Sequence, residues 1–196
     1  MKIVLAAVLA STLLLLPLPA AAASPFGLEL RGGITTPTGD LGEQELESVG
    51  VGLELTGMYR FLPHLSAYAG WGWYHFSTEE DMLGGQLDPE ATGYCAGLRF
   101  EHPLGHTSLA YILRVGVTLE HIEVEDDEGD LVADSDHGLG FEAGVGVAVP
   151  LGEHWRLTPG VRYRALTREL ADDSPAPDVE MDLKYFAFEV GVARSF

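Results

Sequence analysis

Residues 184–196 carry the sequence KYFAFEVGVARSF, in which two kinds of side chain alternate. A repeat of two residues is the period of a β-strand whose two faces differ in polarity. One parity holds small or polar residues, and the other is apolar and includes the final residue of the chain. We therefore predict a strand with one apolar face that runs to the last residue. The apolar face consists of Phe186, Phe188, Val190, Val192 and Phe196.

Seven further stretches alternate in the same way, so the sequence predicts eight strands. In the stretch 65–77 both parities carry aromatic residues, which leaves its register open. Short turns at Pro63, Pro103 and Pro150 separate some of the strands, and long polar connections separate the others. The predicted strands cover 26–36, 49–61, 65–77, 94–101, 109–120, 138–149, 155–168 and 184–196, and the long connections cover 39–48, 78–90, 123–136 and 169–182.

Strands of this length and number, with short turns at one end and long connections at the other, are typical of a small membrane barrel. Alternation alone also fits a soluble, lipocalin-like barrel with its apolar face inside. The membrane alternative is favoured because aromatic residues flank the apolar face and because charges of both signs occupy the other face at mid-strand. We therefore predict an all-β fold, an eight-stranded antiparallel up-and-down transmembrane β-barrel. Its interior ionic network would comprise Glu29, Arg31, Glu54, Arg99, Arg114, Glu120, Glu142, Arg162, Arg164 and Glu189.

With these features the chain resembles the small outer-membrane β-barrel proteins, the OmpA transmembrane-domain and OmpX-like group. The resemblance implies a barrel-only protein of the cell outer membrane, surrounded by lipid and lipopolysaccharide, and we expect a monomer. The even number of strands places both termini on the side of the short turns, the periplasm. It also implies that the barrel-assembly machinery recognises the closing strand. The residues that would carry this signal are Phe186, Phe188, Val190, Val192 and Phe196.

The first residues have the pattern of a secretory signal peptide, and the resemblance implies that the source is a Gram-negative bacterium. A basic start at Lys2 precedes an apolar run that is too short to span a membrane as a helix, and Ala21 to Ala23 form a small-residue cleavage site. We predict a signal peptide at 1–23 and one barrel domain at 24–196. Cys95, the only cysteine, is expected to be a small buried residue, because it has no partner for an internal disulfide.

The net charge of −19 argues against nucleic acid as a partner. The four long connections hold 23 of the 30 acidic residues and no Lys or Arg, which predicts acidic extracellular loops. Carboxylates suit Ca²⁺ or Mg²⁺, but Val124 stands where a calcium loop needs Asp, so only weak cation binding is expected, with a cationic peptide as the alternative partner. The residues for such binding are Glu125, Asp126, Asp127, Glu128 and Asp130, and neither a specific metal site nor a cofactor is predicted.

A barrel of eight strands is only wide enough for side chains to fill its interior, which favours a packed interior over a porin or ion-conducting channel. Some barrels of this size modify lipid A, so combinations of histidine with a hydroxyl or acid are of interest. These combinations do not converge on one site, and we predict that the protein is not an enzyme. A structural or surface-interaction role remains. The combinations are His75 with Ser77, His121 with Glu120 or Glu123, and Ser135 with His137.

Overall fold

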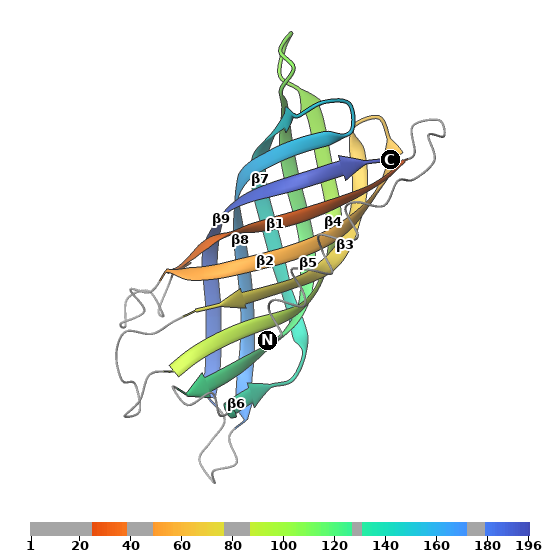
Figure 1. Cartoon of the computed structure of the whole chain (residues 1–196). Helices are drawn as coiled ribbons and strands as arrows, with labels where there is room; N and C mark the ends of the chain where they lie inside the picture. Colours follow the sequence, from red (N-terminus) through yellow and green to blue (C-terminus); the bar gives the residue numbers. More distant parts are fainter. Residues whose placement is uncertain (1–24, 39–48, 77–86, 127–130, 172–178) are drawn as a thin grey trace.

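The computed structural model describes residues 25–38, 49–76, 87–126, 131–171 and 179–196. These residues form antiparallel strands, eight of which close into a barrel (Figure 1). None of the described residues belongs to a helix long and apolar enough to cross a membrane. The strands are β1 Phe26–Thr38, β2 Gly50–Leu62, β3 Leu65–His75, β4 Leu87–Pro103, β5 Ala110–Asp126, β6 Leu131–Ser135, β7 Gly138–Pro150, β8 Trp155–Ala171 and β9 Val179–Ser195.

Each barrel strand pairs with its neighbours in the chain, and the barrel closes where β9 pairs with β1. In this closing seam Leu30 lies opposite Val192, and the pairing extends from Gly27 to Thr38. The predicted fold class, an eight-stranded antiparallel up-and-down barrel, is confirmed. The short β2–β3, β4–β5 and β7–β8 connections lie at the same end as the C-terminus, and we call this the turn end; β6 lies at the opposite, loop end (Figure 1).

The predicted connection 123–136 is wrong, because β5 continues to Asp126 and β6 follows. β6 pairs with both β5 and β8, and so occupies the place between them beyond the start of β7. Glu123 lies opposite Asp134 and Glu120 opposite Gly138. Three residues, 135–137, therefore face two residues of β5, 121 and 122. This surplus residue is a β-bulge.

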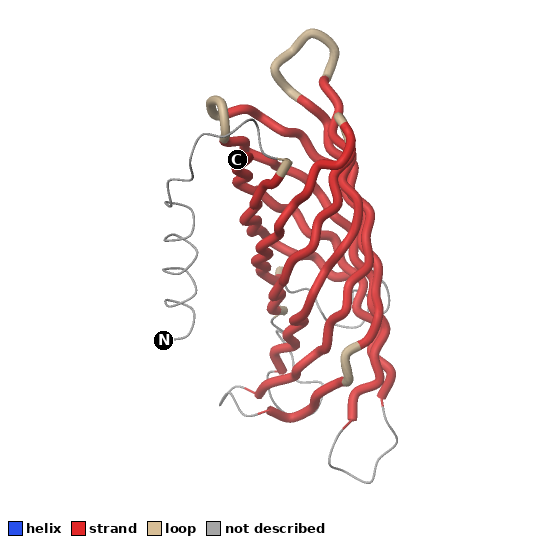
Figure 2. Tube along the Cα trace, turned by 90° about the vertical axis from the view of Figure 1, so that its right-hand side faces the viewer, coloured by secondary structure: helices blue, strands red, loops and turns tan. Residues whose placement is uncertain are grey.

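The predicted connections 78–90 and 169–182 are also too long, because β4, β5, β8 and β9 each contain 17 residues. At about 3.3 Å per residue such strands are roughly 55 Å long. A strand of about 10 residues, tilted by about 40°, crosses an apolar band of roughly 25 Å. The four strands therefore reach beyond the band, and Figure 2 shows strands slanting along the whole length of the barrel.

Apolar side chains of the central part face outward, and charged side chains face inward. On β2, Leu53 and Leu55 are 41% and 38% exposed, whereas Glu54 between them is 1% exposed. This polarity is the opposite of that in a soluble barrel. The open register of β3 is resolved with Tyr68 and Tyr74 inward and Trp71 outward.

The polarity inverts near the loop end of the same strands. On β5, Leu119 faces outward and Glu120 inward, but two residues further on Ile122 and Val124 are buried, while His121 lies on the outer face. β9 shows the same change, because Leu183 is buried where the central part of this strand has charged Glu189 inside. This part of the sheet thus has the polarity of a barrel in water.

Candidate functional site

Ten charged side chains point into the barrel and form what we call the ionic layer. They are at most 8% exposed, although each has a full formal charge. Every barrel strand except β3 contributes, and the five carboxylates balance the five guanidinium groups. The layer consists of Glu29, Arg31, Glu54, Arg99, Arg114, Glu120, Glu142, Arg162, Arg164 and Glu189.

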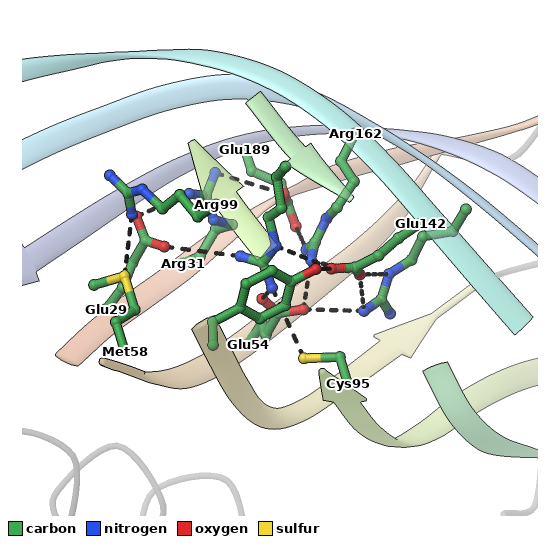
Figure 3. A network of polar contacts seen from close by, with 12 residues as sticks. Glu29, Arg31, Glu54, Met58, Cys95, Arg99, Glu142, Arg162 and Glu189 are labelled. Atoms are coloured by element: carbon green, nitrogen blue, oxygen red, sulfur yellow. Dashed lines mark hydrogen bonds and ion pairs between the residues drawn. The ribbon is translucent and has the colours of Figure 1, made fainter. Parts of the chain in front are cut away.

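Two glutamates from different strands form the centre of the layer, and they share three arginines (Figure 3). The carboxylate of Glu54 lies 2.7 Å from Arg114, 2.6 Å from Arg162 and 3.0 Å from Arg164. The carboxylate of Glu142 lies 2.9, 3.0 and 2.7 Å from the same three arginines. The cluster thus joins β2, β5, β7 and β8 across the barrel interior.

The ionic layer extends from this centre in both directions along the barrel. Toward the loop end, Arg164 contacts Glu120 at 2.7 Å. Toward the turn end, Glu29 lies 2.8 Å from Arg31 and 3.3 Å from Arg99. Ion pairs between different strands therefore occur at several levels of the interior.

Two tyrosines of β3 contact this layer, and sequence reasoning missed both. The Tyr68 hydroxyl donates a hydrogen bond of 2.5 Å to Glu142, and its ring lies 3.8 Å from the Arg114 guanidinium carbon. A Cβ at Gly116 would lie 2.2 Å from the Tyr68 oxygen, so this approach requires glycine. Tyr74 is fully buried nearby. Gly116, on the inward face of β5, could have indicated that a bulky side chain lies against it. Because the register of β3 was open in the sequence, it did not show that this side chain is Tyr68.

A cluster of buried apolar residues closes the interior between the ionic layer and the loop end, and we call it the apolar cap. The rings of Phe76 and Tyr185 meet edge to face, with centroids 5.1 Å apart. The sequence analysis did not predict this cap, because it assigned most of these residues to strand ends or to loops. The cap comprises Tyr74, Phe76, Ala91, Ile122, Val124, Leu166, Leu183, Tyr185 and Ala187.

The turn end of the interior is open by comparison. A cavity of about 350 Å³ lies there, with Arg60, Arg99 and Glu101 in its wall. Arg99 reaches Glu101 at 3.0 Å, and Arg156 also pairs with Glu101. The ionic layer thus continues into a polar vestibule, whereas the opposite end of the interior is apolar.

The proposed assembly-signal residues form one face of β9. Phe186, Phe188 and Val190 are 41%, 48% and 51% exposed on the outer surface, and Val192 and Phe196 are half-buried. The backbone N–H of Phe196 donates a hydrogen bond of 3.1 Å to the carbonyl of Phe26. The last residue is therefore tied to the first strand.

Several predicted residues fall outside the described part of the chain. Asp127, Glu128 and Asp130 are not described, and Glu125 and Asp126 are described only as backbone of β5. Residues 1–24 and Ser77 likewise lie outside the described ranges. Cys95 is buried, and its sulfur lies 3.8 Å from Arg114.

The histidine combinations considered for catalysis are only partly brought together. His121 contacts Glu123 at 3.0 Å, whereas the Ser135 hydroxyl accepts a hydrogen bond from the backbone N–H of Ile122. His75 contacts Glu90 at 3.1 Å. The Ser135 hydroxyl therefore binds the backbone of β5, which is a structural role.

A further polar contact lies on the outer face near the loop end. Lys184 and Thr167 donate hydrogen bonds to Asp182 and hold the pKa of its carboxyl below the usual value. This carboxylate therefore stays charged in the water-facing part of the sheet.

Comparisons with known proteins agree with the geometry. A family model described as outer membrane protein beta-barrel domain matches residues 6–196. Neisserial surface protein A has a similar structure, with a TM-score of 0.64 and 15% identity over 90% of this chain and 100% of its own. OprG from Pseudomonas aeruginosa gives 0.58 and 16% over 90% of this chain and 98% of its own. No curated protein matches the chain. The resemblance to small outer-membrane barrels is confirmed.

Proposed function

The chain belongs to the outer membrane protein β-barrel domain family, and on this premise we propose that it is a barrel with a closed interior that acts through its outer surface. The observation that carries this proposal is the stacking of the ionic layer under the apolar cap. Such an interior supports a structural or surface-interaction role rather than the transport of solutes.

An ion that crosses this interior would meet two different obstacles. In the ionic layer it would have to separate buried charge pairs, and breaking one such pair leaves an uncompensated charge at a cost of about 3–5 kcal/mol. In the apolar cap it would lose its hydration among side chains such as Phe76 and Leu183, which offer no replacement ligands. An ion would have to pass the ionic layer and the apolar cap one after the other.

Because the interior is closed, we expect binding to other molecules to take place on the outer surface. The connections between the strands at the loop end contain acidic residues but no Lys or Arg. A surface of this kind attracts cationic peptides or proteins, and its carboxylates suit Ca²⁺ or Mg²⁺. The partner class we propose is therefore cationic, and its binding would weaken strongly with added salt.

The location follows the same proposal. The chain is exported by a signal peptide at 1–23, assembled by the barrel-assembly machinery and placed as a monomer among outer-membrane lipid and lipopolysaccharide. The turn end, with the C-terminus, faces the periplasm. Short periplasmic turns and longer extracellular connections are the usual arrangement in such barrels.

Planar-bilayer recording tests the closed interior. We expect the refolded barrel to show no steady conductance at moderate voltage, while a general diffusion porin in the same bilayers conducts. Heat-modifiable mobility on a gel confirms that the inserted protein is folded. Reproducible conductance steps from folded protein would contradict the proposal and favour a channel.

A further inference from the structure

A mixed cluster of imidazole and carboxylate groups lies on the outer face near the loop end, where the sheet has turned its polar side outward. The Nε2 atom of His121 lies 3.0 Å from the Glu123 carboxylate. One ligand atom each from His121, Glu123 and Asp134 lie within 4.8 Å of one another. These side chains belong to β5 and β6 and are separate from the ionic layer.

The local fold explains why these residues meet. His121 and Glu123 are two residues apart on β5 and therefore share a face. Asp134 on β6 lies directly opposite Glu123. Residues opposite each other in an antiparallel pair have Cβ atoms about 4.5–5.5 Å apart, so the carboxylates of Glu123 and Asp134 lie close together.

The β-bulge between β6 and β7 adds a second histidine. It places His137 beside His121, with His121 Nδ1 and His137 Nε2 separated by 3.2 Å and the ring centroids by 4.4 Å. The bulge itself is held by Ser135, whose buried hydroxyl accepts a 2.8 Å hydrogen bond from the N–H of Ile122. Bulges of this kind re-aim side chains and are frequent beside functional sites.

From this arrangement we propose that His121, Glu123 and Asp134 bind a first-row divalent transition-metal ion such as Zn²⁺. Zinc binds histidine nitrogen and carboxylate oxygen at about 2.0–2.2 Å in tetrahedral geometry. Ligand atoms around such an ion are roughly 3.3 Å apart, close to the observed 3.0 Å between His121 and Glu123. Asp134 is exposed, and its side chain can rotate toward the ion.

The charge and the supporting contact fit the same ion. Two carboxylates balance a divalent cation, and an imidazole ligand selects transition metals over Ca²⁺ or Mg²⁺. With His121 Nε2 turned to the metal, its Nδ1–H donates to His137 Nε2, and such outer contacts orient metal-bound imidazoles. Three protein ligands leave a fourth position for water or for a donor from another molecule.

Calorimetry with Zn²⁺ on the refolded barrel, in excess Mg²⁺ to occupy carboxylates elsewhere, tests the site. We expect one Zn²⁺ per chain and a d–d absorption band when Co²⁺ is used instead. His121→Ala should abolish this binding, and Glu123→Gln and Asp134→Asn should each weaken it. His137→Ala should weaken it by about 10- to 100-fold, the usual effect of losing an outer contact.

The matched control is His75→Ala, because His75 also pairs with a carboxylate, Glu90, on neighbouring strands. This variant should bind Zn²⁺ like the unaltered protein. Heat-modifiable mobility identifies folded samples, and the nearly isosteric Glu123→Gln provides a test if His121→Ala does not fold. Absence of Zn²⁺ binding, equal binding by the ligand variants, or an equal loss in His75→Ala would each overturn the proposal.

Discussion

Arg164 shows how a single residue depends on the barrel around it. It is fully buried and forms ion pairs with Glu54, Glu120 and Glu142, which belong to three different strands. Burial of a charge is costly, and here three carboxylates from β2, β5 and β7 offset it. The same contacts hold those strands together, so the side chain links packing to barrel closure.

Replacing this residue should destabilise the barrel strongly. Arg164→Met keeps an unbranched, flexible side chain but removes the guanidinium group and leaves the three carboxylates with one buried cation fewer, which we expect to cost about 3–5 kcal/mol. Urea unfolding from lipid bilayers measures the difference. Arg156→Met is the control, because the Arg156 side chain is 36% exposed, and it should cost less than about 1 kcal/mol. Equal losses for the two variants would contradict this account of the ionic layer.

At the scale of the element, β9 completes the barrel by pairing with both β8 and β1. Deleting Phe196 removes an outward aromatic side chain and the hydrogen bond to Phe26. We expect much less folded protein in the outer membrane, measured as the heat-modifiable fraction in isolated membranes. Phe141→Ala removes an aromatic residue of the outer surface from β7 and should reduce this fraction far less. Similar amounts of the two folded proteins would argue against a role of the last residue in assembly.

The elements also show which features a sequence can predict. The central strands and the inward direction of residues such as Glu54 follow from the two-residue period, because lipid and interior differ in polarity. The positions of the strand ends could not be predicted from this period. Beyond the apolar band, polar residues such as Glu123 face water and resemble loop residues. The bulge that places His137 beside His121 depends on pairing between strands, which no local pattern contains.

For the whole molecule, the prediction concerns orientation. Cys95 is buried, so a membrane-impermeant maleimide should leave the unaltered protein unlabelled on intact cells. His106→Cys at the turn end should also remain unlabelled until the outer membrane is permeabilised, whereas Thr167→Cys near the loop end should react at once. Both positions are exposed in the structure. Labelling of the turn-end variant on intact cells would reverse the proposed topology.

The inversion of polarity along β5 and β9 also sets the depth of the barrel in its membrane. A barrel with uniform strands can slide along the bilayer normal when the lipid becomes thinner or thicker. Here such a shift would bring His121 and Glu123 into hydrocarbon in one direction and Leu119 into water in the other. Mismatch between the apolar band and the bilayer costs fractions of a kcal/mol per Å. It would be accommodated by deformation of the lipid rather than by movement of the barrel along the bilayer normal. The bilayer must therefore adjust its thickness around the barrel, which stays at one level.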